Sequence, residues 1–299
     1  MKIGSVSHII HTHAKLLLLY NQNLFCKFEL ILLFYIRMRI KKVILIYFSA
    51  TYTTRKVVRA LAQTFGCEVT ELDVTSRLPE TEVRMTGEGE LLIVGMPVYA
   101  GRIPQQGAQA LDMIKGDGTP AIAVCVYGNR DYDDALLETA DLLANSGFHT
   151  VAAAAFIAQH SIFPQLAAGR PDEADMTKLE EFGRACKEKI EAWHNGDSIP
   201  APTIKGNRPY KKPGAIPLHP HGDKKKCNSC GTCARLCPAE AIGTDEPWKT
   251  DGDKCISCGR CVAVCPQHAR RFSGLLYAVA EKKIVGGNRA RKEPEWFIG

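Results

Sequence analysis

Short apolar runs recur along the first two thirds of the chain, separated by segments of mixed polarity. The runs at 43–48 and 91–95 lack the polar alternation of a half-buried strand, which is typical of a strand that is buried on both faces. In the segments between the runs, apolar residues recur at helical spacing. Strands are predicted at 43–48, 68–74, 91–95, 121–127 and 150–157, and helices at 54–65, 134–146 and 172–193. This alternation predicts an α/β fold with a doubly wound, parallel, five-stranded sheet.

The twelve cysteines are distributed unevenly, and eight of them form two identically spaced runs near the C-terminus. Each run follows the pattern C-x-x-C-x-x-C-x-x-x-C-P. In this pattern three cysteines bind one iron–sulfur cubane and the fourth binds the other. Two [4Fe-4S] clusters are therefore predicted. Cluster one takes Cys227, Cys230, Cys233 and Cys265, and cluster two takes Cys255, Cys258, Cys261 and Cys237.

A zinc site or a set of disulfides fits these cysteines less well. A zinc ribbon needs two pairs of cysteines, not two quartets that each end in proline. Disulfides need an oxidising compartment, and the N-terminal stretch does not have the pattern of a signal peptide. The segment around the two runs is short and poor in apolar residues. We therefore expect the clusters to act as its core.

Composition divides the rest of the chain into predicted segments. Residues 38–195 form the α/β domain, and residues 222–273 form a small α+β domain around the clusters. Residues 196–221 are rich in proline, which predicts an extended, semi-rigid linker. Residues 274–299 are predicted to continue as a helix that packs on the cluster domain, followed by a polar, basic tail.

Residues 1–37 contain two apolar runs that are divided by polar residues and followed by Arg37 and Arg39. A membrane-spanning helix needs about 20 predominantly apolar residues, and a signal peptide needs one apolar run before small residues. Neither pattern fits. We interpret Met38 as the biological start and residues 1–37 as a non-native extension, with a peripheral membrane anchor as the alternative. A cytoplasmic protein without membrane association is expected.

The formal net charge of +6 is divided between the two halves of the chain. Residues 39–195 carry −5 and residues 196–299 carry +8. Because opposite potentials favour association, we expect the two halves to dock by charge. The expected contacts join Lys224, Lys225, Lys226 and Arg260 to Asp131, Asp133 and Asp134. No aromatic-rich basic stripe points to nucleic acid, and the sequence identifies neither a redox partner nor an oligomeric state.

Three loops follow the first, third and fourth predicted strands, at the edge where doubly wound sheets bind ligands. The first offers hydroxyls and backbone N–H groups at a helix N-terminus, which form a phosphate seat. The second offers a tyrosine for stacking on a planar ring, and the third combines glycine with a second tyrosine. The candidate binding residues are Ser49, Thr51, Thr53, Thr54, Pro97, Tyr99, Gly101, Gly128, Asn129 and Tyr132.

Together these loops resemble those of the flavodoxin family, whose phosphate loop reads Thr/Ser-x-Thr-Gly-x-Thr. Ser49, Thr51 and Thr54 occupy the hydroxyl positions, and Tyr52 stands where the family has glycine. The resemblance covers about residues 41–195 and implies FMN as the cofactor. With the linker and the two cysteine runs, everything after Met38 resembles flavodoxin–ferredoxin fusion proteins of anaerobic prokaryotes.

This second resemblance implies an electron carrier that moves electrons between the two clusters and FMN. No acid–base pair or nucleophile motif marks a catalytic site. Two alternatives stay open. One is a flavin-dependent reductase of a small substrate, and the other is a ferredoxin attached to a flavin-free docking domain. His160 and Ser161, after the fifth predicted strand, are interpreted as capping or packing residues.

Overall fold

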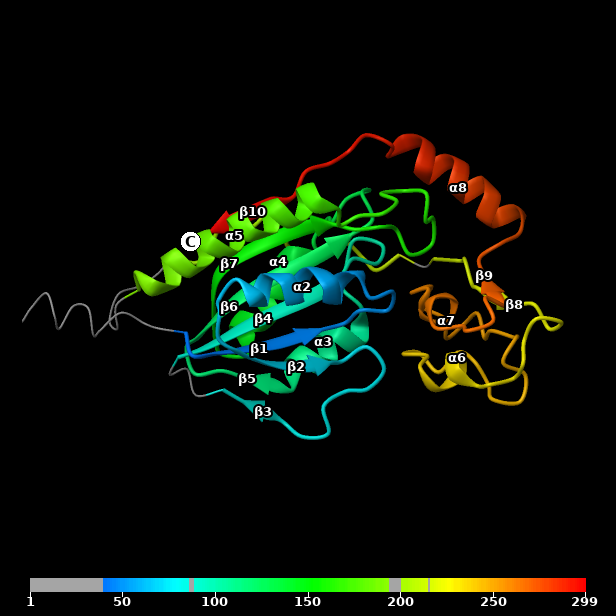
Figure 1. Ribbon diagram of the computed structural model, residues 1–299, viewed down its shortest axis with the longest axis horizontal. Coiled ribbons are helices and arrows are strands. Elements are labelled where there is room, and N and C mark those ends of the chain that lie inside the picture. Colours follow the sequence, from blue (N-terminus) through cyan, green and yellow to red (C-terminus); the bar gives the residue numbers. More distant parts are fainter. Residues whose placement is uncertain (1–39, 86–88, 194–199, 215) are drawn as a thin grey trace, which may run out of the picture.

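The computed structural model describes residues 40–85, 89–193, 200–214 and 216–299. The interpretation of residues 1–37 therefore falls outside the described part of the chain. Within that part, no helix is both long enough and apolar enough to cross a membrane. Figure 1 shows a layered α/β domain with a smaller module beside it, and helix α8 (Leu275–Gly287) lies above that module in this view.

The α/β domain is built on a sheet with the strand order β10-β7-β6-β4-β1-β2. Five of these strands are parallel, and their order along the sheet, 2-1-3-4-5 counted along the chain, is the flavodoxin-like doubly wound arrangement. They are β1 (Lys42–Tyr47), β2 (Glu68–Asp73), β4 (Glu90–Pro97), β6 (Thr119–Tyr127) and β7 (Phe148–Ile157). The predicted fold class is confirmed.

Helices cover both faces of this sheet (Figure 1). On one face lie α2 (Thr53–Gln63) and α5 (Glu173–Glu191), and on the other lie α3 (Gln105–Asp112) and α4 (Ala135–Asn145). The helix α3 was not predicted. Every residue of β6 is buried, which explains why its sequence is an uninterrupted apolar run. A separate two-stranded ribbon pairs β3 (Val83–Arg84) with β5 (Ile114–Lys115).

The C-terminal tail, expected only as a polar and basic segment, returns to the sheet. Its strand β10 (Glu295–Ile298) pairs antiparallel with β7 and adds a sixth strand. Trp296 packs on Phe182 of α5, with ring centroids 5.9 Å apart. Helix α8 packs mainly on the loop after β7 rather than on the cysteine runs. Its Tyr277 lies against Phe163 of that loop, with ring centroids 5.3 Å apart. The α/β domain thus holds the chain on both sides of the cysteine runs.

The cysteine module (residues 220–273) consists of two similar halves. One half contains α6 (Thr232–Arg235) and the other α7 (Arg260–Ala263), and β8 (His221–Gly222) pairs antiparallel with β9 (Arg270–Arg271). Both cysteine runs pass through the same left-handed backbone positions. The φ angles are 54° at Ser229, 68° at Gly231, 56° at Ser257 and 77° at Gly259. The repeated sequence therefore produces a repeated backbone.

The described part of the proline-rich linker, residues 200–214, lies against the α/β domain. The backbone N–H groups of Asn207 and Lys211 donate to the Asp134 carboxylate over 2.8 and 2.6 Å. Arg208 pairs with Asp141 at 2.5 Å. These contacts bind residues 207–211 to the α/β domain. Only the short segment after residue 211 is left to separate the cysteine module from the sheet.

Candidate functional site

The eight cysteines of the module surround two separate hollows. The first encloses about 340 Å³ and the second about 310 Å³. Cys227, Cys230, Cys233 and Cys265 line the first, and Cys237, Cys255, Cys258 and Cys261 line the second. This is the grouping that the spacing predicts, with four thiols around each space, as a cubane requires. The role of each cysteine as an iron ligand stays a prediction.

Backbone amides point at the sulfur atoms in a repeated pattern. The N–H groups of Ala241 and Ala269 donate to the sulfur atoms of Cys237 and Cys265, each over 3.3 Å. Hydrogen bonds of this kind favour the thiolate and help to set the reduction potential of a bound cluster. The backbone therefore prepares both hollows for thiolate ligands.

The two runs differ in what covers them. Cys230 is exposed, and the Thr232 hydroxyl, 3.4 Å from its sulfur, lowers the pKa of this thiol. Cys258 has the equivalent position in the second run but is 8% exposed, and burial raises its pKa to about 12. Burial also raises the pKa of Cys261 to about 11. Burial also raises the pKa of Cys233 in the first run. Both hollows therefore contain buried thiols, whose thiolate forms need a neutralising cation.

A third hollow lies at the carboxyl ends of β1, β4, β6 and β7, at the edge where the sequence predicts a flavin site. This flavin-type hollow contains about 400 Å³ of empty space and is open to solvent on one side. Six predicted binding residues, from all three loops, line it: Thr51, Thr53, Thr54, Pro97, Tyr99 and Gly128. Gln159, His160 and Ser161 complete its wall. The last two were interpreted as packing residues, although the end of the fifth strand at this same edge is a signal that could have placed them here.

Tyr52 adopts the conformation for which the flavodoxin motif has glycine. Its φ of 67° and ψ of −5° are left-handed, at the position just before α2. Such a conformation costs a residue with a side chain about 1–2 kcal/mol. The Tyr52 side chain is 43% exposed and does not line the flavin-type hollow. The loop therefore keeps the shape of a phosphate seat, with the tyrosine ring on its outer side.

The cysteine module packs on this loop through Arg260. Its Nη1 donates to the carbonyl oxygens of Ser49 and Ala50, both over 3.3 Å, and its guanidinium lies 4.9 Å from the centre of the Tyr52 ring. Arg260 is only 7% exposed and belongs to the second cysteine run. The outward ring of Tyr52 is thus part of the contact between the two domains.

Two neighbours of Arg260 extend the contact. A Cβ at Gly259 would lie 3.2 Å from the carbonyl oxygen of Ser161 and 3.4 Å from Cγ2 of Thr51, so glycine permits this close approach. Cys258 belongs to the same apolar core as Tyr99, which lines the flavin-type hollow. Burial, and then the Cys258 thiolate, raise the pKa of Tyr99 well above its usual value. The second cysteine hollow and the flavin-type hollow therefore meet across one interface.

Comparison with protein families identifies the cysteine runs. Residues 226–269 match the model of the 4Fe-4S dicluster domain. This segment is similar to 4Fe-4S dicluster domains, and the cysteine module is called the dicluster domain from here on. It supports an iron–sulfur electron-transfer role for the chain. No curated protein sequence matches the chain as a whole.

Several solved structures are similar to about half of this chain. An archaeal flavodoxin is 15% identical, with a TM-score of 0.35, covering 50% of this chain and 98% of its own. Flavodoxin 2 from Bacillus cereus is 16% identical, with a TM-score of 0.37, covering 50% and 99%. A flavodiiron protein from Giardia intestinalis is 18% identical, with a TM-score of 0.33, covering 52% and 37%. The flavodoxin-like fold of the α/β domain itself follows from its strand order.

Ser49 and Gly101, two predicted binding residues, lie beside the flavin-type hollow and shape its loops. The Ser49 hydroxyl accepts a hydrogen bond from the N–H of Arg55 over 3.0 Å, which fixes the phosphate-type loop. Gly101 has a φ of 90°, and a Cβ there would lie 2.3 Å from a carboxylate oxygen of Asp133. Only glycine therefore allows the second and third loops to pack together.

Asn129 and Tyr132 were predicted to contact the flavin, but the structure places both against the C-terminal tail. The Asn129 side-chain amide donates to the carbonyl oxygens of Asn288 and Ala290 over 2.7 and 2.9 Å. The Tyr132 hydroxyl donates to Glu295 of β10 over 2.7 Å, and Tyr132 is 1% exposed. Both side chains are occupied by the tail, so we remove them from the candidate flavin contacts.

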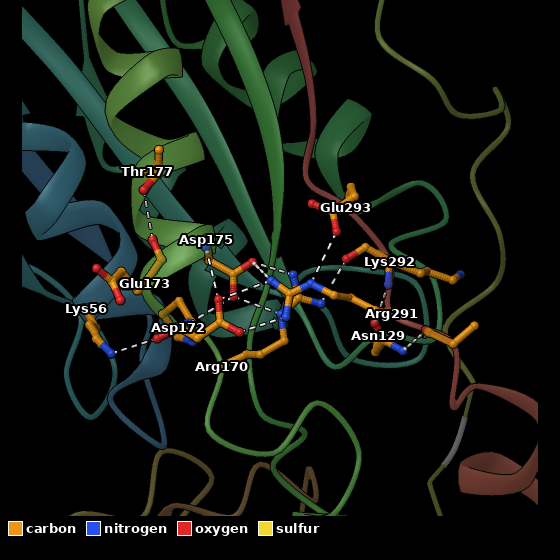
Figure 2. A network of polar contacts seen from close by, with 12 residues as sticks. Lys56, Asn129, Arg170, Asp172, Glu173, Asp175, Thr177, Arg291, Lys292 and Glu293 are labelled. Atoms are coloured by element: carbon orange, nitrogen blue, oxygen red, sulfur yellow. Dashed lines mark hydrogen bonds and ion pairs between the residues drawn. The ribbon is translucent and has the colours of Figure 1, made fainter.

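Ion pairs hold the same tail across the start of α5 (Figure 2). Arg291 pairs with Asp172 at 2.7 Å and with Asp175 at 3.3 Å. Asp175 also pairs with the buried Arg170, and the N–H of Lys292 donates to Asn129 over 3.3 Å. The tail is therefore fixed to two loops at the edge of the sheet that carries the flavin-type hollow.

The expected ion pairs between the dicluster domain and the third loop are not formed. Asp133 pairs with Arg130 and with Lys211 of the linker, and the Asp134 carboxylate is occupied by linker N–H groups. Among the described residues, Lys224, Lys225 and Lys226 form no ion pair, and all three are exposed. Of the four expected cations only Arg260 reaches the interface, where it contacts carbonyl groups and a ring. In the part of the chain that the structure describes, the direct contacts between the two domains are packing, hydrogen bonds to carbonyl groups and a cation–ring contact, without an ion pair.

The residues around the flavin-type hollow fit a flavin mononucleotide. Thr51, Thr53 and Thr54 present hydroxyls at the N-terminus of α2, which suits a phosphate group. Tyr99 supplies an aromatic wall.

His160 adds a polar group to the same wall. Its Nδ1 accepts hydrogen bonds from the N–H groups of Ile162 and Phe163 over 3.1 and 3.3 Å, which assigns the proton to Nε2. Burial, and then Arg130, lower the pKa of His160 to about 4. His160 is therefore a neutral hydrogen-bond donor at neutral pH.

Proposed function

We propose that this protein transfers electrons between two [4Fe-4S] clusters and an FMN held by the flavodoxin-like domain. FMN exchanges two electrons in single steps, and each cluster carries one. The observation that carries the proposal is the interface: the second cysteine run packs on the loop that would hold the FMN phosphate, through Arg260 and Gly259. Such close packing is what electron transfer between the two cofactors needs.

The chain's own residues would bind and orient the cofactors. The two groups of four cysteines would hold the clusters, with backbone N–H groups stabilising their sulfur atoms. Thr51, Thr53 and Thr54 would bind the flavin phosphate, and Tyr99 would cover the ring. His160 would donate a hydrogen bond to the ring system, because its free ring nitrogen carries the proton. These residues would bind and position the cofactors, and the electrons would pass between the cofactors themselves.

The interface favours an electron carrier over a reductase of a small substrate. The dicluster domain approaches the flavin-type hollow from the side of the phosphate-type loop, and α8 packs on the loop after β7. Both elements occupy the edge of the sheet from which a substrate would approach. A catalytic acid or base for such a substrate is not needed for the proposed function, and none is assigned.

Reconstitution with iron, sulfide and FMN tests the proposal. We expect about eight iron atoms per chain, as two four-iron clusters require, and about one FMN with its characteristic absorbance. After photoreduction of the clusters, the flavin absorbance should fall as the cluster absorbance recovers. A protein that binds iron but no FMN would favour the flavin-free docking domain. Steady turnover with a small electron acceptor, but not with a protein acceptor, would favour the reductase.

A further inference from the structure

The surface around the first cysteine hollow differs from the surface around the second. Asn228, Ser229 and Cys230 are all exposed, whereas the equivalent segment of the second run, residues 256–258, leads into the interface with the α/β domain. Cluster two, bound where the cysteines place it, would face the flavin-type hollow. Cluster one would face solvent, so another redox protein would be able to approach it directly.

A set of basic residues borders this exposed edge. We call it the basic rim and define it as Lys224, Lys225, Lys226 and Arg235, all exposed. No Asp or Glu occurs between residues 224 and 235. The basic rim therefore follows the cluster-one cysteines along the chain without an acidic residue among them.

Contacts within the described structure fix the basic rim close to the cysteines. Arg235 donates to the carbonyl oxygen of Cys230 over 2.9 Å, and the Lys224 ammonium lies 4.8 Å from the centre of the Trp248 ring. Trp248 lines the first cysteine hollow. Four acidic residues lie between residues 223 and 249, namely Asp223, Glu240, Asp245 and Glu246. Asp223 accepts a hydrogen bond from the N–H of Lys225, and Glu246 pairs with Lys249 at 2.5 Å. Residues 223–249 hold five basic and four acidic residues, and the positive charge is concentrated in residues 224–235, where all four residues of the basic rim and no acidic residue lie.

We propose that the basic rim is a docking surface for an acidic electron-transfer protein that exchanges electrons with cluster one. Positive charge around an exposed redox centre raises the rate of encounter with an acidic partner and orients it. Among the described residues, no rim side chain forms a hydrogen bond or ion pair with the α/β domain, which reaches this run through the Ser76 hydroxyl, 3.2 Å from the carbonyl oxygen of Leu236. The charge of the basic rim is therefore available to an external partner. This inference rests on the proposed function, because it makes cluster one the external end of the electron path.

The test uses a small acidic [2Fe-2S] ferredoxin as the probe and the cluster-loaded protein as its acceptor. The rim variant is Lys225→Glu/Lys226→Glu/Arg235→Glu. The matched control is Lys282→Glu/Lys283→Glu/Arg289→Glu, which changes net charge by the same amount at exposed positions on and after α8. Iron content is measured first, and Lys225→Glu/Lys226→Glu alone replaces the rim variant if the change at Arg235 lowers it.

Stopped-flow mixing with the reduced ferredoxin should give a second-order rate constant at least about tenfold lower in the rim variant at low salt. The control should change it far less, because its charges lie away from cluster one. Above about 0.5 M salt the difference should disappear, since screening then acts over only a few ångströms. The dissociation constant of the ferredoxin complex, measured by calorimetry without FMN, should rise in the rim variant alone.

Equal slowing in the rim variant and the control would show that net charge alone matters, and would overturn the proposal. Parent-like rates and affinity in the rim variant would also overturn it. Failure of the proposed function looks different. In that case the ferredoxin would reduce the clusters of the parent protein, but the electrons would not reach FMN.

Discussion

The two cysteine runs of the dicluster domain share one spacing and one backbone, but they have different surroundings. In the first run Cys230 is exposed, and its pKa is lowered by Thr232. In the second run Cys258 is buried, and its pKa is raised to about 12. Arg260, at the position of Thr232, anchors the second run to the flavodoxin-like domain. The cysteine spacing determines where a cluster binds, whereas single residues between the cysteines determine what the cluster faces.

Replacing a single cysteine, in either the first or the second run, should have the largest effect on iron content and stability. Cys230→Ser and Cys258→Ser should each lower the iron content from about eight to about four atoms per chain, or fewer, since each change removes one corner of one cluster. Bound metal is part of the folding free energy of such a domain, so both variants should also unfold more readily. Iron quantitation and thermal unfolding measure these changes. An unchanged iron content in either variant would contradict the ligand assignment.

Exchanging the residues that distinguish the runs should have a moderate effect. Arg260→Thr places in the second run the threonine that the first run has at the equivalent position. Thr232→Arg places in the first run the arginine of the second. Arg260→Thr should lower the free energy of unfolding by about 1–3 kcal/mol, because it leaves two carbonyl groups at a buried interface without their donor. It should also slow transfer from the clusters to FMN. Denaturant titration and flash photolysis measure the two effects.

Thr232→Arg is the matched control for that exchange. Thr232 is partly exposed, and its hydroxyl contacts Cys230 rather than the α/β domain. Thr232→Arg should therefore change the surroundings of the first cysteine hollow but leave the interface, and the rate of transfer from the second cluster to FMN, close to those of the parent. If the two exchanges had equal effects, Arg260 would not be what distinguishes the second run.

Changing Tyr52 should have a small net effect, because two contributions oppose each other. Tyr52→Gly removes the left-handed strain of about 1–2 kcal/mol. It also removes the ring beneath Arg260, worth about 0.5–2 kcal/mol. The free energy of unfolding should therefore change by less than about 1 kcal/mol, and Tyr52→Phe, which keeps the ring, should behave like the parent. A loss above about 2 kcal/mol in Tyr52→Gly would mean that the ring contact is stronger than its geometry indicates.

The smallest effect should come from changing the salt concentration, measured on the rate of electron transfer from cluster to FMN within the protein. The domains meet through packing, hydrogen bonds to carbonyl groups and a linker bound along the sheet domain, so screening has little to weaken. The rate from cluster to FMN should change less than about twofold between about 0.05 and 0.5 M salt, in contrast to the rate of reduction by an external acidic protein. A steep fall in the internal rate would restore the docking by net charge that the sequence suggested.

The elements that the sequence predicts best are those whose signal lies within a short stretch of the chain. Apolar runs located four of the five parallel strands, because strands buried on both faces need no polar positions. The fifth, β2, is an exposed strand at the sheet edge with mixed polarity, and it was predicted from its place in the alternation of strands and helices. The cysteine spacing predicted which four thiols surround each hollow, since a cubane fixes the distances among its ligands. The helix α3 was missed because Gln105, Gln106 and Gly107 at its start give a weak helical pattern.

The features that could not be predicted depend on contacts between distant residues. The strand β10 pairs with β7 across more than a hundred residues of chain, and its four residues form too short a run to predict a strand, although Trp296, Phe297 and Ile298 favour one. Asn129 and Tyr132 lie in the expected loop, but the returning tail occupies both side chains. Net charge indicated that the two halves attract each other, yet the interface formed through Arg260 and uncharged neighbours.

The central claim is that cluster two faces the flavin and cluster one faces solvent. Flash photolysis of the two cysteine variants, each loaded with FMN and its remaining cluster, tests it most directly. In Cys230→Ser, which keeps cluster two, the flavin should still accept electrons from the cluster at close to the parent rate. In Cys258→Ser, which keeps cluster one, that kinetic phase should be lost while about half of the iron remains. Fast transfer in Cys258→Ser, or its loss in Cys230→Ser at half the parent iron content, would contradict the account.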